Sequence, residues 1–176
     1  MKKGGITAYE IALSATSCAI ATILLTVGIY SQVFLFTGYL FGGITLMLPL
    51  AKKSYLGYLL SYFSTCILSL IFASGYFFDL LPFAMFFGLH PLVNELQLKT
   101  QINRWLACFA KAVWFDIAMY IIWRFVFSMT TSVTLVDKYI LPFIVVFGTL
   151  FFIAYDYAMF KWRFAVNRLV NRISRK

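Results

Sequence analysis

The sequence predicts an all-α integral membrane protein, built as one bundle of six transmembrane helices. Two observations on composition lead to this fold class. Of the 176 residues, 62% are apolar and only 12% are charged, whereas a soluble domain has roughly 45–50% apolar and about 25% charged residues. A chain of this length cannot bury so much apolar surface in its own core. The third observation is six apolar segments, each near the roughly 20 residues that a helix needs to cross a bilayer.

The six predicted spans follow one another with short connections and form a single domain. Each is expected to be helical, because a lone strand would leave its backbone groups unpaired in lipid. The first run is expected to remain uncleaved, since the residues before Cys18 lack the large aliphatic residue of a lipoprotein cleavage site. The spans cover approximately residues 8–27, 33–50, 55–72, 80–96, 105–129 and 139–160.

The placement of charge predicts the orientation of these spans. The net charge is +9, and six of the fifteen Lys and Arg lie in the tail, residues 161–176. Others lie at Lys2–Lys3, Lys52–Lys53 and Lys99–Arg104, whereas the three alternate connections hold one Lys and no Arg. Because cations mark cytoplasmic loops, both termini are predicted to be cytoplasmic. The same pattern favours membrane lipid over nucleic acid as the partner of these cations.

The basic tail mixes its cations with apolar residues at helical spacing. This pattern is typical of a helix that lies on the membrane surface, and it is equally typical of an extension of the sixth span.

Residues that could carry catalysis or bind a metal are few and scattered. Cys18, Cys66 and Cys108 lie singly in apolar runs, and the chain has one His and six acidic residues. No catalytic motif such as GxSxG, HExxH or a phosphate-binding loop is present. We therefore expect no enzymatic activity, no cofactor and no metal site.

A stripe of small residues marks the first span. Ala8, Ala12, Ala15 and Ala19 recur at spacings that place them on one helix face. Small residues let a second helix approach closely, which is a main source of helix association in lipid. The stripe either packs inside this protein's own bundle or docks a partner membrane subunit.

A polar stripe marks the fifth span. Asp116, Tyr120 and Arg124 stand four residues apart on one face. Charges at such depth are costly and usually face a cavity or a partner group. One interpretation is a ligand-binding wall open to the outside, with Arg124 holding an anionic group. The other is an internal ion pair, with Arg124 reaching outward to the membrane surface.

Four further polar residues are predicted to share one depth near the cytoplasmic side: His90, Glu95, Lys111 and Asp156. A Lys111–Asp156 pair would relieve two buried charges, and we favour this structural interpretation. A role for His90 as a proton relay or metal ligand is disfavoured, because a lone His makes a poor metal site. The sequence leaves the pairing of Lys111, Asp116, Arg124 and Asp156 open.

The outer connection at residues 74–82 is rich in aromatic residues. Aromatics at this level commonly form a belt at the membrane interface. A Gly-led aromatic loop is also suited to cap a pocket for a flat or apolar molecule.

The chain resembles the substrate-binding S components of energy-coupling factor (ECF) transporters. Three features carry the resemblance: the alanine stripe, Leu48-Pro49-Leu50 with the basic turn and Gly57 that follow it, and residues 81–92 in the fourth span. The resemblance implies a six-span subunit of the bacterial cytoplasmic membrane that binds a micronutrient and hydrolyses nothing itself. It implies docking through the alanine face to a transmembrane coupling subunit, which works with two cytoplasmic ATPases.

The resemblance implies a pocket for the substrate in the outer half of the bundle, and depth alone selects the residues expected to line it. The residues predicted to bind the substrate are Tyr76, Phe77, Asp79, Tyr120, Trp123, Arg124 and Lys138, with Tyr30 and Gln32 beside them. The competing hypothesis is a membrane scaffold similar to the rod-shape protein MreD, which would bind protein partners and no small molecule. Tight packing of the outer halves of spans four to six, with no cavity between them, would favour the scaffold.

Overall fold

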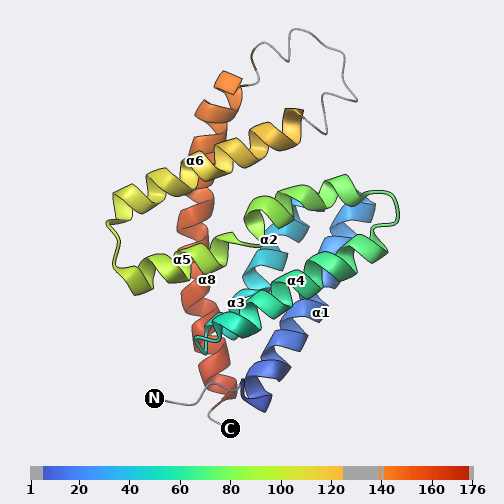
Figure 1. Ribbon diagram of the computed structural model, residues 1–176, viewed down its shortest axis with the longest axis vertical. Coiled ribbons are helices and arrows are strands. Elements are labelled where there is room, and N and C mark those ends of the chain that lie inside the picture. Colours follow the sequence, from blue (N-terminus) through green and yellow to red (C-terminus); the bar gives the residue numbers. More distant parts are fainter. Residues whose placement is uncertain (1–5, 125–138, 140, 175–176) are drawn as a thin grey trace.

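The computed structural model describes residues 6–124, 139 and 141–174, and these residues contain helices and no strand (Figure 1). The all-α prediction is confirmed for this part of the chain. The elements are α1 (Ala8–Ser31), α2 (Leu35–Thr45), α3 (Met47–Leu50), α4 (Tyr55–Phe72), η1 (Phe77–Leu80), η2 (Phe83–Phe87), α5 (His90–Thr100), α6 (Arg104–Ile122), η4 (Ile144–Gly148) and α8 (Thr149–Ile173).

Five described stretches are long and apolar enough to cross a membrane, which indicates a multi-pass membrane protein. They are Ala8–Ser31, Tyr55–Phe72, Phe77–Thr100, Arg104–Ile122 and Leu141–Ile173. The second predicted span corresponds to Leu35–Leu50, a shorter apolar stretch divided into α2 and α3. At 1.5 Å per residue it extends about 24 Å, less than the roughly 30 Å of the hydrocarbon layer.

Polar capping residues and a backbone turn set the ends of α1. Thr7 and Glu10 form a reciprocal capping box at its start, with the Thr7 amide donating to Glu10 Oε2 at 2.8 Å. The helix ends where Gln32 takes a positive φ of 55°. It therefore continues to Ser31, beyond the end at residue 27 that hydropathy predicts, because hydropathy does not register the turn.

The tail continues the last span. α8 runs without interruption from Thr149 to Ile173, so it extends the sixth span instead of forming a separate surface helix. Its end returns to the α3–α4 turn, where Lys52 Nζ donates to Ser174 Oγ at 2.9 Å. Lys52 Nζ also lies 5.7 Å from the centre of the Tyr9 ring. The start of α1, this turn and the end of α8 thus share one end of the molecule (Figure 1).

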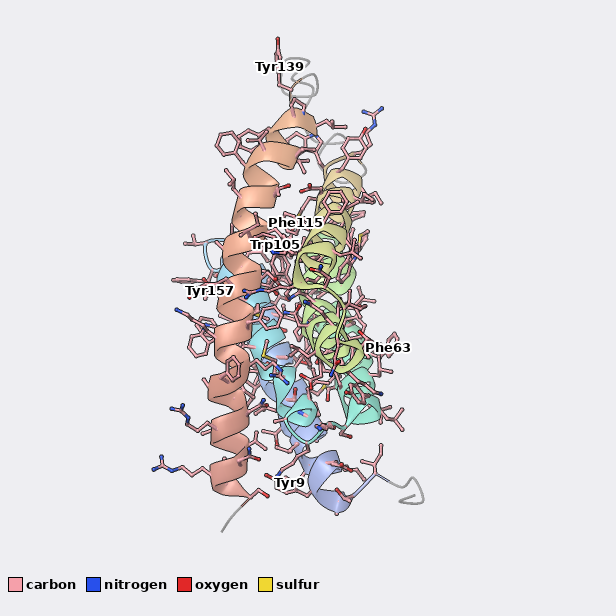
Figure 2. All side chains as sticks on the ribbon, turned by 90° about the vertical axis from the view of Figure 1, so that its left-hand side faces the viewer. Tyr9, Phe63, Trp105, Phe115, Tyr139 and Tyr157 are labelled. Atoms are coloured by element: carbon pink, nitrogen blue, oxygen red, sulfur yellow. The ribbon has the colours of Figure 1, made fainter. Side chains whose placement is uncertain are left out.

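The opposite end of α8 lies far from this point, since Tyr139 and Tyr9 occupy opposite ends in Figure 2. This arrangement agrees with two termini on one side, and their cytoplasmic location stays a prediction.

Aromatic side chains form much of the core. Tyr58, Phe83, Phe86 and Phe152 are fully buried. Phe86 contacts a ring from each of α6 and α8, with centroids 4.8 Å away at Phe115 and 5.9 Å away at Phe152. Many other large apolar side chains are exposed around the outside, as expected where lipid is the solvent. Phe63 and Tyr157 are examples that project from opposite sides of the bundle (Figure 2).

Candidate functional site

An apolar hollow of about 310 Å³ lies where α2, η2, α6 and α8 meet. Its walls come from elements that are distant in sequence and are mostly aromatic. The lining residues are Phe36, Tyr39, Pro82, Phe87, Phe115, Met119 and Phe151. Sequence reasoning singled out none of them as binding residues, because Phe and Tyr are abundant throughout the chain and no pattern distinguishes these.

The rings around the hollow hold one another in fixed orientations. Tyr39 stacks on Phe87 with centroids 5.4 Å apart and planes at 20°. Phe36 meets Phe87 and Phe151 edge-on, at 5.8 Å and 5.2 Å. Such contacts add to the stability of the walls beyond their buried area. The arrangement offers flat faces and edges to a ligand, within a volume at the lower limit for small-molecule sites.

The Asp79 cap, comprising Tyr30, Gln32, Tyr76, Phe77 and Asp79, lies beside this hollow. The Tyr39 hydroxyl, which belongs to the hollow wall, donates a hydrogen bond to the Asp79 carbonyl oxygen. Gln32 Nε2 donates to Asp79 Oδ2 at 2.8 Å, which ties the end of α1 to η1.

The aromatic residues of the cap complete this connection. Tyr30 donates its hydroxyl to the Phe72 carbonyl at 2.7 Å and lies edge-on to Tyr76 at 6.1 Å. The structure thus brings Tyr76, Phe77 and Asp79 together, as the sequence predicts, and the rings of Tyr76 and Phe77 are about half exposed.

The polar face of α6 contributes to a second and smaller hollow of about 200 Å³. Asp116 and Tyr120 line it together with Ile117, Leu141, Ile144 and Val145. Thr149 Oγ1 donates to Asp116 Oδ2 at 2.9 Å, so the described partner of this carboxylate comes from α8. The sequence did not identify Thr149, because a hydroxyl in an apolar run carries no distinctive signal.

The remaining predicted binding residues are Trp123, Arg124 and Lys138. Trp123 and Arg124 follow the end of α6, and Arg124 is exposed. Lys138 lies outside the described residues. The contacts described above form two groups, the Asp79 cap and the Asp116–Tyr120 hollow, and the role of these groups in binding stays a prediction.

A buried polar ring of His90, Asn94, Lys111 and Asp156 joins α5, α6 and α8. Lys111 Nζ lies 2.6 Å from Asp156 Oδ1, which confirms the predicted ion pair. His90 Nε2 lies 3.0 Å from the same oxygen. Asn94 closes the ring, since its Oδ1 accepts from Lys111 at 2.8 Å and its Nδ2 lies 3.5 Å from His90 Nδ1. Each charged group thus has a partner in the membrane interior, as such groups require.

Glu95 has a separate partner that the sequence did not identify. Arg163 donates to both of its carboxylate oxygens, at 2.6 Å and 3.1 Å. Arg163 belongs to the basic tail, where hydropathy gives no reason to expect a partner on α5. Within the ranges that the structure describes, no group of three His, Cys, Asp or Glu residues is positioned to hold a metal ion.

The alanine stripe of α1 faces outward. Ala8, Ala12, Ala15 and Ala19 are all exposed, so the interpretation that they pack inside the protein's own bundle is wrong.

Serines take the inward positions of α1 because they can bond to neighbouring backbone. Ser17 Oγ donates to the Thr45 carbonyl at 2.8 Å, and Ser14 Oγ donates to the Glu10 carbonyl at 2.8 Å. Ala15 and Ala19 border an apolar groove of about 500 Å³ between α1 and α4.

These features define a multi-pass, all-α membrane protein with an aromatic hollow between its helices and an exposed small-residue face on α1. Comparison of the chain with protein-family models, with curated proteins and with solved structures finds no match.

Proposed function

We propose that this protein is the non-enzymatic, substrate-binding transmembrane subunit of an ECF-type importer in a bacterial cytoplasmic membrane. The observation that carries the proposal is the aromatic hollow between α2, η2, α6 and α8. It adjoins the Asp79 cap, which the charge pattern assigns to the outer side. A purely structural scaffold has no need of a hollow at this level, so the importer subunit is the better-supported function.

The chemistry of the hollow favours a flat and mainly apolar micronutrient. Its walls consist of five aromatic side chains with Pro82 and Met119. The Tyr39 hydroxyl, the polar group of this wall, is engaged with the Asp79 carbonyl. An anionic group placed between these rings would lose its hydration without gaining a partner. An aromatic ring system would instead stack against Tyr39, Phe87 or Phe36.

The exposed alanine face supports the second half of the proposal, which is docking to a coupling subunit. Ala15 and Ala19 lie at the border of the α1–α4 groove and present no side chain beyond a methyl group. A helix of a partner can approach such a face to backbone distance. The coupling subunit and two cytoplasmic ATPases would supply the energy, and this chain would supply specificity.

The substrate half of the proposal is tested by the small molecules that the purified protein carries. Extraction followed by mass spectrometry of the wild type should identify an aromatic micronutrient. Met119→Trp, which fills the hollow, should abolish its retention. Val113→Trp is the matched control, because Val113 is an exposed residue of α6 outside the hollow. Equal retention by Met119→Trp and the wild type would contradict the assignment of the hollow.

The docking half is tested by co-expression with candidate coupling subunits. Ala15→Leu/Ala19→Leu should reduce co-purification by at least about tenfold, because the added side chains prevent close approach. Ala110→Leu/Ala154→Leu adds the same bulk at exposed positions of α6 and α8 and should have no effect. Loss of protein partners from a chain that never carries a small molecule would favour the scaffold similar to MreD.

A further inference from the structure

Two arginines near the end of α8 lack the partners that neighbouring cations have. Arg163 forms an ion pair with Glu95, and Lys161 Nζ lies 4.6 Å from the centre of the Tyr157 ring. Arg168 and Arg172 are exposed, and in the described part of the chain neither has an ion-pair or hydrogen-bond partner. Like charges four residues apart on a helix repel each other, so this pair is unfavourable without an anion.

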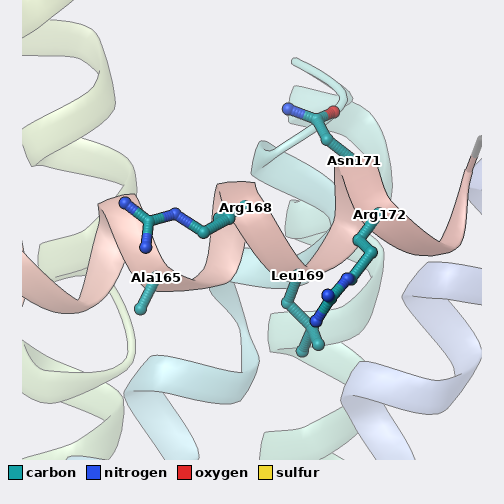
Figure 3. A pocket seen from close by; sticks show the side chains of 5 residues that line it. All are labelled: Ala165, Arg168, Leu169, Asn171 and Arg172. Atoms are coloured by element: carbon teal, nitrogen blue, oxygen red, sulfur yellow. The ribbon is translucent and has the colours of Figure 1, made fainter.

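The two arginines border an open hollow of about 840 Å³ on the surface of α8, together with Ala165, Leu169 and Asn171. Figure 3 shows Arg172 and Leu169 extending from one side of the helix, Arg168 extending along the helix toward Ala165, and Asn171 extending from the opposite side. Guanidinium groups bind phosphate oxygens through paired N–H donors. The hollow therefore combines the donors that a phosphate requires with apolar contacts from Leu169 and Ala165.

The position of the arginine pair along the molecule corresponds to a lipid headgroup layer. Leu141–Ile173 has 33 residues, which gives about 50 Å of helix against roughly 30 Å of hydrocarbon. The final turns must therefore leave the hydrocarbon. They do not extend freely away from the bundle, because Ser174 accepts a hydrogen bond from Lys52 in the α3–α4 turn.

Exposed apolar side chains near the arginines favour a lipid over a water-soluble phosphate. Phe164, Leu169 and Ile173 expose 64%, 52% and 58% of their surface. A soluble phosphate would satisfy the guanidinium groups and leave these side chains in water. A phospholipid satisfies the guanidinium groups with its phosphodiester, while its acyl chains, which run back toward the hydrocarbon, cover Phe164 and Leu169.

We propose that Arg168 and Arg172 form a specific site for the phosphodiester of an anionic glycerophospholipid in the leaflet that contains the basic ends of the helices. Leu169 contacts the acyl chains. The site fixes the end of α8 at the membrane surface. It is separate from the aromatic hollow and independent of the proposed transport function.

The experiment is a native mass spectrometry titration of the detergent-purified protein with dioleoyl phosphatidylglycerol. Arg168→Gln/Arg172→Gln should weaken the first binding event by at least about tenfold, because each cation near an anionic lipid contributes several-fold to affinity. Arg104→Gln/Lys161→Gln removes two charges at other positions and should stay within about twofold of the wild type. Arg168→Lys/Arg172→Lys keeps both charges without the guanidinium fork, and it should bind with intermediate affinity.

Two further arms distinguish the source of the phosphate. Dioleoyl phosphatidylcholine has the same phosphodiester without net charge and should bind weakly to every variant. Glycerol 1-phosphate at millimolar concentration should not displace phosphatidylglycerol, and displacement would overturn the assignment to lipid. An equal loss of affinity in both Gln double variants would overturn a specific site. Unchanged affinity in Arg168→Gln/Arg172→Gln would also overturn the lipid site. An acidic protein surface would then be the better candidate partner of the two arginines.

Discussion

Asp156 Oδ1 receives Lys111 Nζ and His90 Nε2 at the same time, at 2.6 Å and 3.0 Å. One carboxylate oxygen thereby connects α8 with both α5 and α6. Asn94 orients the Lys111 ammonium and the His90 ring, because its Oδ1 accepts from Lys111 and its Nδ2 lies toward His90 Nδ1. A closed ring of this kind tolerates burial because each member satisfies its neighbours, whereas the loss of one member leaves others unpaired.

The first prediction concerns this ring. Lys111→Met should destabilise the protein by about 3–5 kcal/mol, because it leaves the Asp156 carboxylate buried without its counter-ion. Lys111→Met/Asp156→Asn should recover roughly half of this loss, since a neutral amide still accepts from His90. Thermal unfolding in detergent measures both changes. Lys161→Met, at an exposed cation of α8, is the control and should stay within about 0.5 kcal/mol. A double variant no more stable than Lys111→Met would contradict the argument.

The sequence predicts an ion pair correctly where the depth of two charged residues in the membrane is enough to identify them as partners. Lys111 and Asp156 lie at matching depths in two apolar runs, and charges in lipid must find each other. The Glu95–Arg163 pair was missed because Arg163 follows the apolar run, where a cation is also satisfied by headgroups. The hollow residues were missed for a different reason. Their arrangement depends on the crossing of four elements, and hydropathy carries no information on crossing.

At the scale of elements, α1 and α2 approach each other closely, and this approach depends on glycine. A Cβ added to Gly38 would lie 2.8 Å from the Leu24 carbonyl oxygen, and one added to Gly28 would lie 3.4 Å from the Gly38 Cα. Gly38 and Gly42 stand four residues apart on α2, which is the spacing typical of close helix pairs in membranes. Both glycines are buried against the core.

The second prediction follows from this approach. Gly38→Leu should destabilise the protein by about 1–3 kcal/mol or more, because the rigid backbone of α1 leaves no space for the side chain. Thr37→Leu provides a matched control, since Thr37 is the preceding residue of α2 and is exposed. Thermal unfolding of the two variants in the same detergent gives the comparison. Equal melting temperatures would mean that α1 and α2 can separate without cost.

The two small-residue patterns explain which part of the element packing was predictable. The alanine stripe was identified from spacing, and the glycine pair of α2 has the same spacing, yet one is exposed and the other is buried. In water, burial follows hydrophobicity, but here lipid-facing and core positions are equally apolar. Spacing alone therefore finds the faces on which helices can approach and does not say whether the approaching helix belongs to the same chain.

At the scale of the whole molecule, the sequence specified the helical class and most of the span positions because apolar length is a direct signal. Two departures have physical causes. Leu35–Leu50 begins two residues later than the predicted span because Val33 and Phe34 belong to the turn after α1, and a continuous apolar run conceals both this turn and the break between α2 and α3. α8 continues past residue 160 because Lys and Arg are compatible with a helix. Hydropathy places the end of the span there because the apolar run ends. The distribution of Lys and Arg predicts the orientation of the spans. The position of Ser174 beside Lys52 is consistent with this orientation, because both residues are predicted to be cytoplasmic.

The last prediction tests this orientation in cells. With Cys18, Cys66 and Cys108 replaced by Ala, single cysteines are introduced at Phe78, Ile102 and Ser174, all exposed. A membrane-impermeant maleimide should label Phe78→Cys in intact cells. Ile102→Cys and Ser174→Cys should react only after permeabilisation, because cations hold their connections on the cytoplasmic side.

An exposed position in the middle of a span, Ile67→Cys, controls for access through lipid and should resist the reagent in both conditions. Labelling of Ser174→Cys in intact cells would reverse the orientation. The Asp79 cap and the aromatic hollow would then lie on the cytoplasmic side, where a subunit of an importer could not receive its substrate. The same labelling pattern therefore decides whether the charge distribution and the proposed direction of transport are compatible.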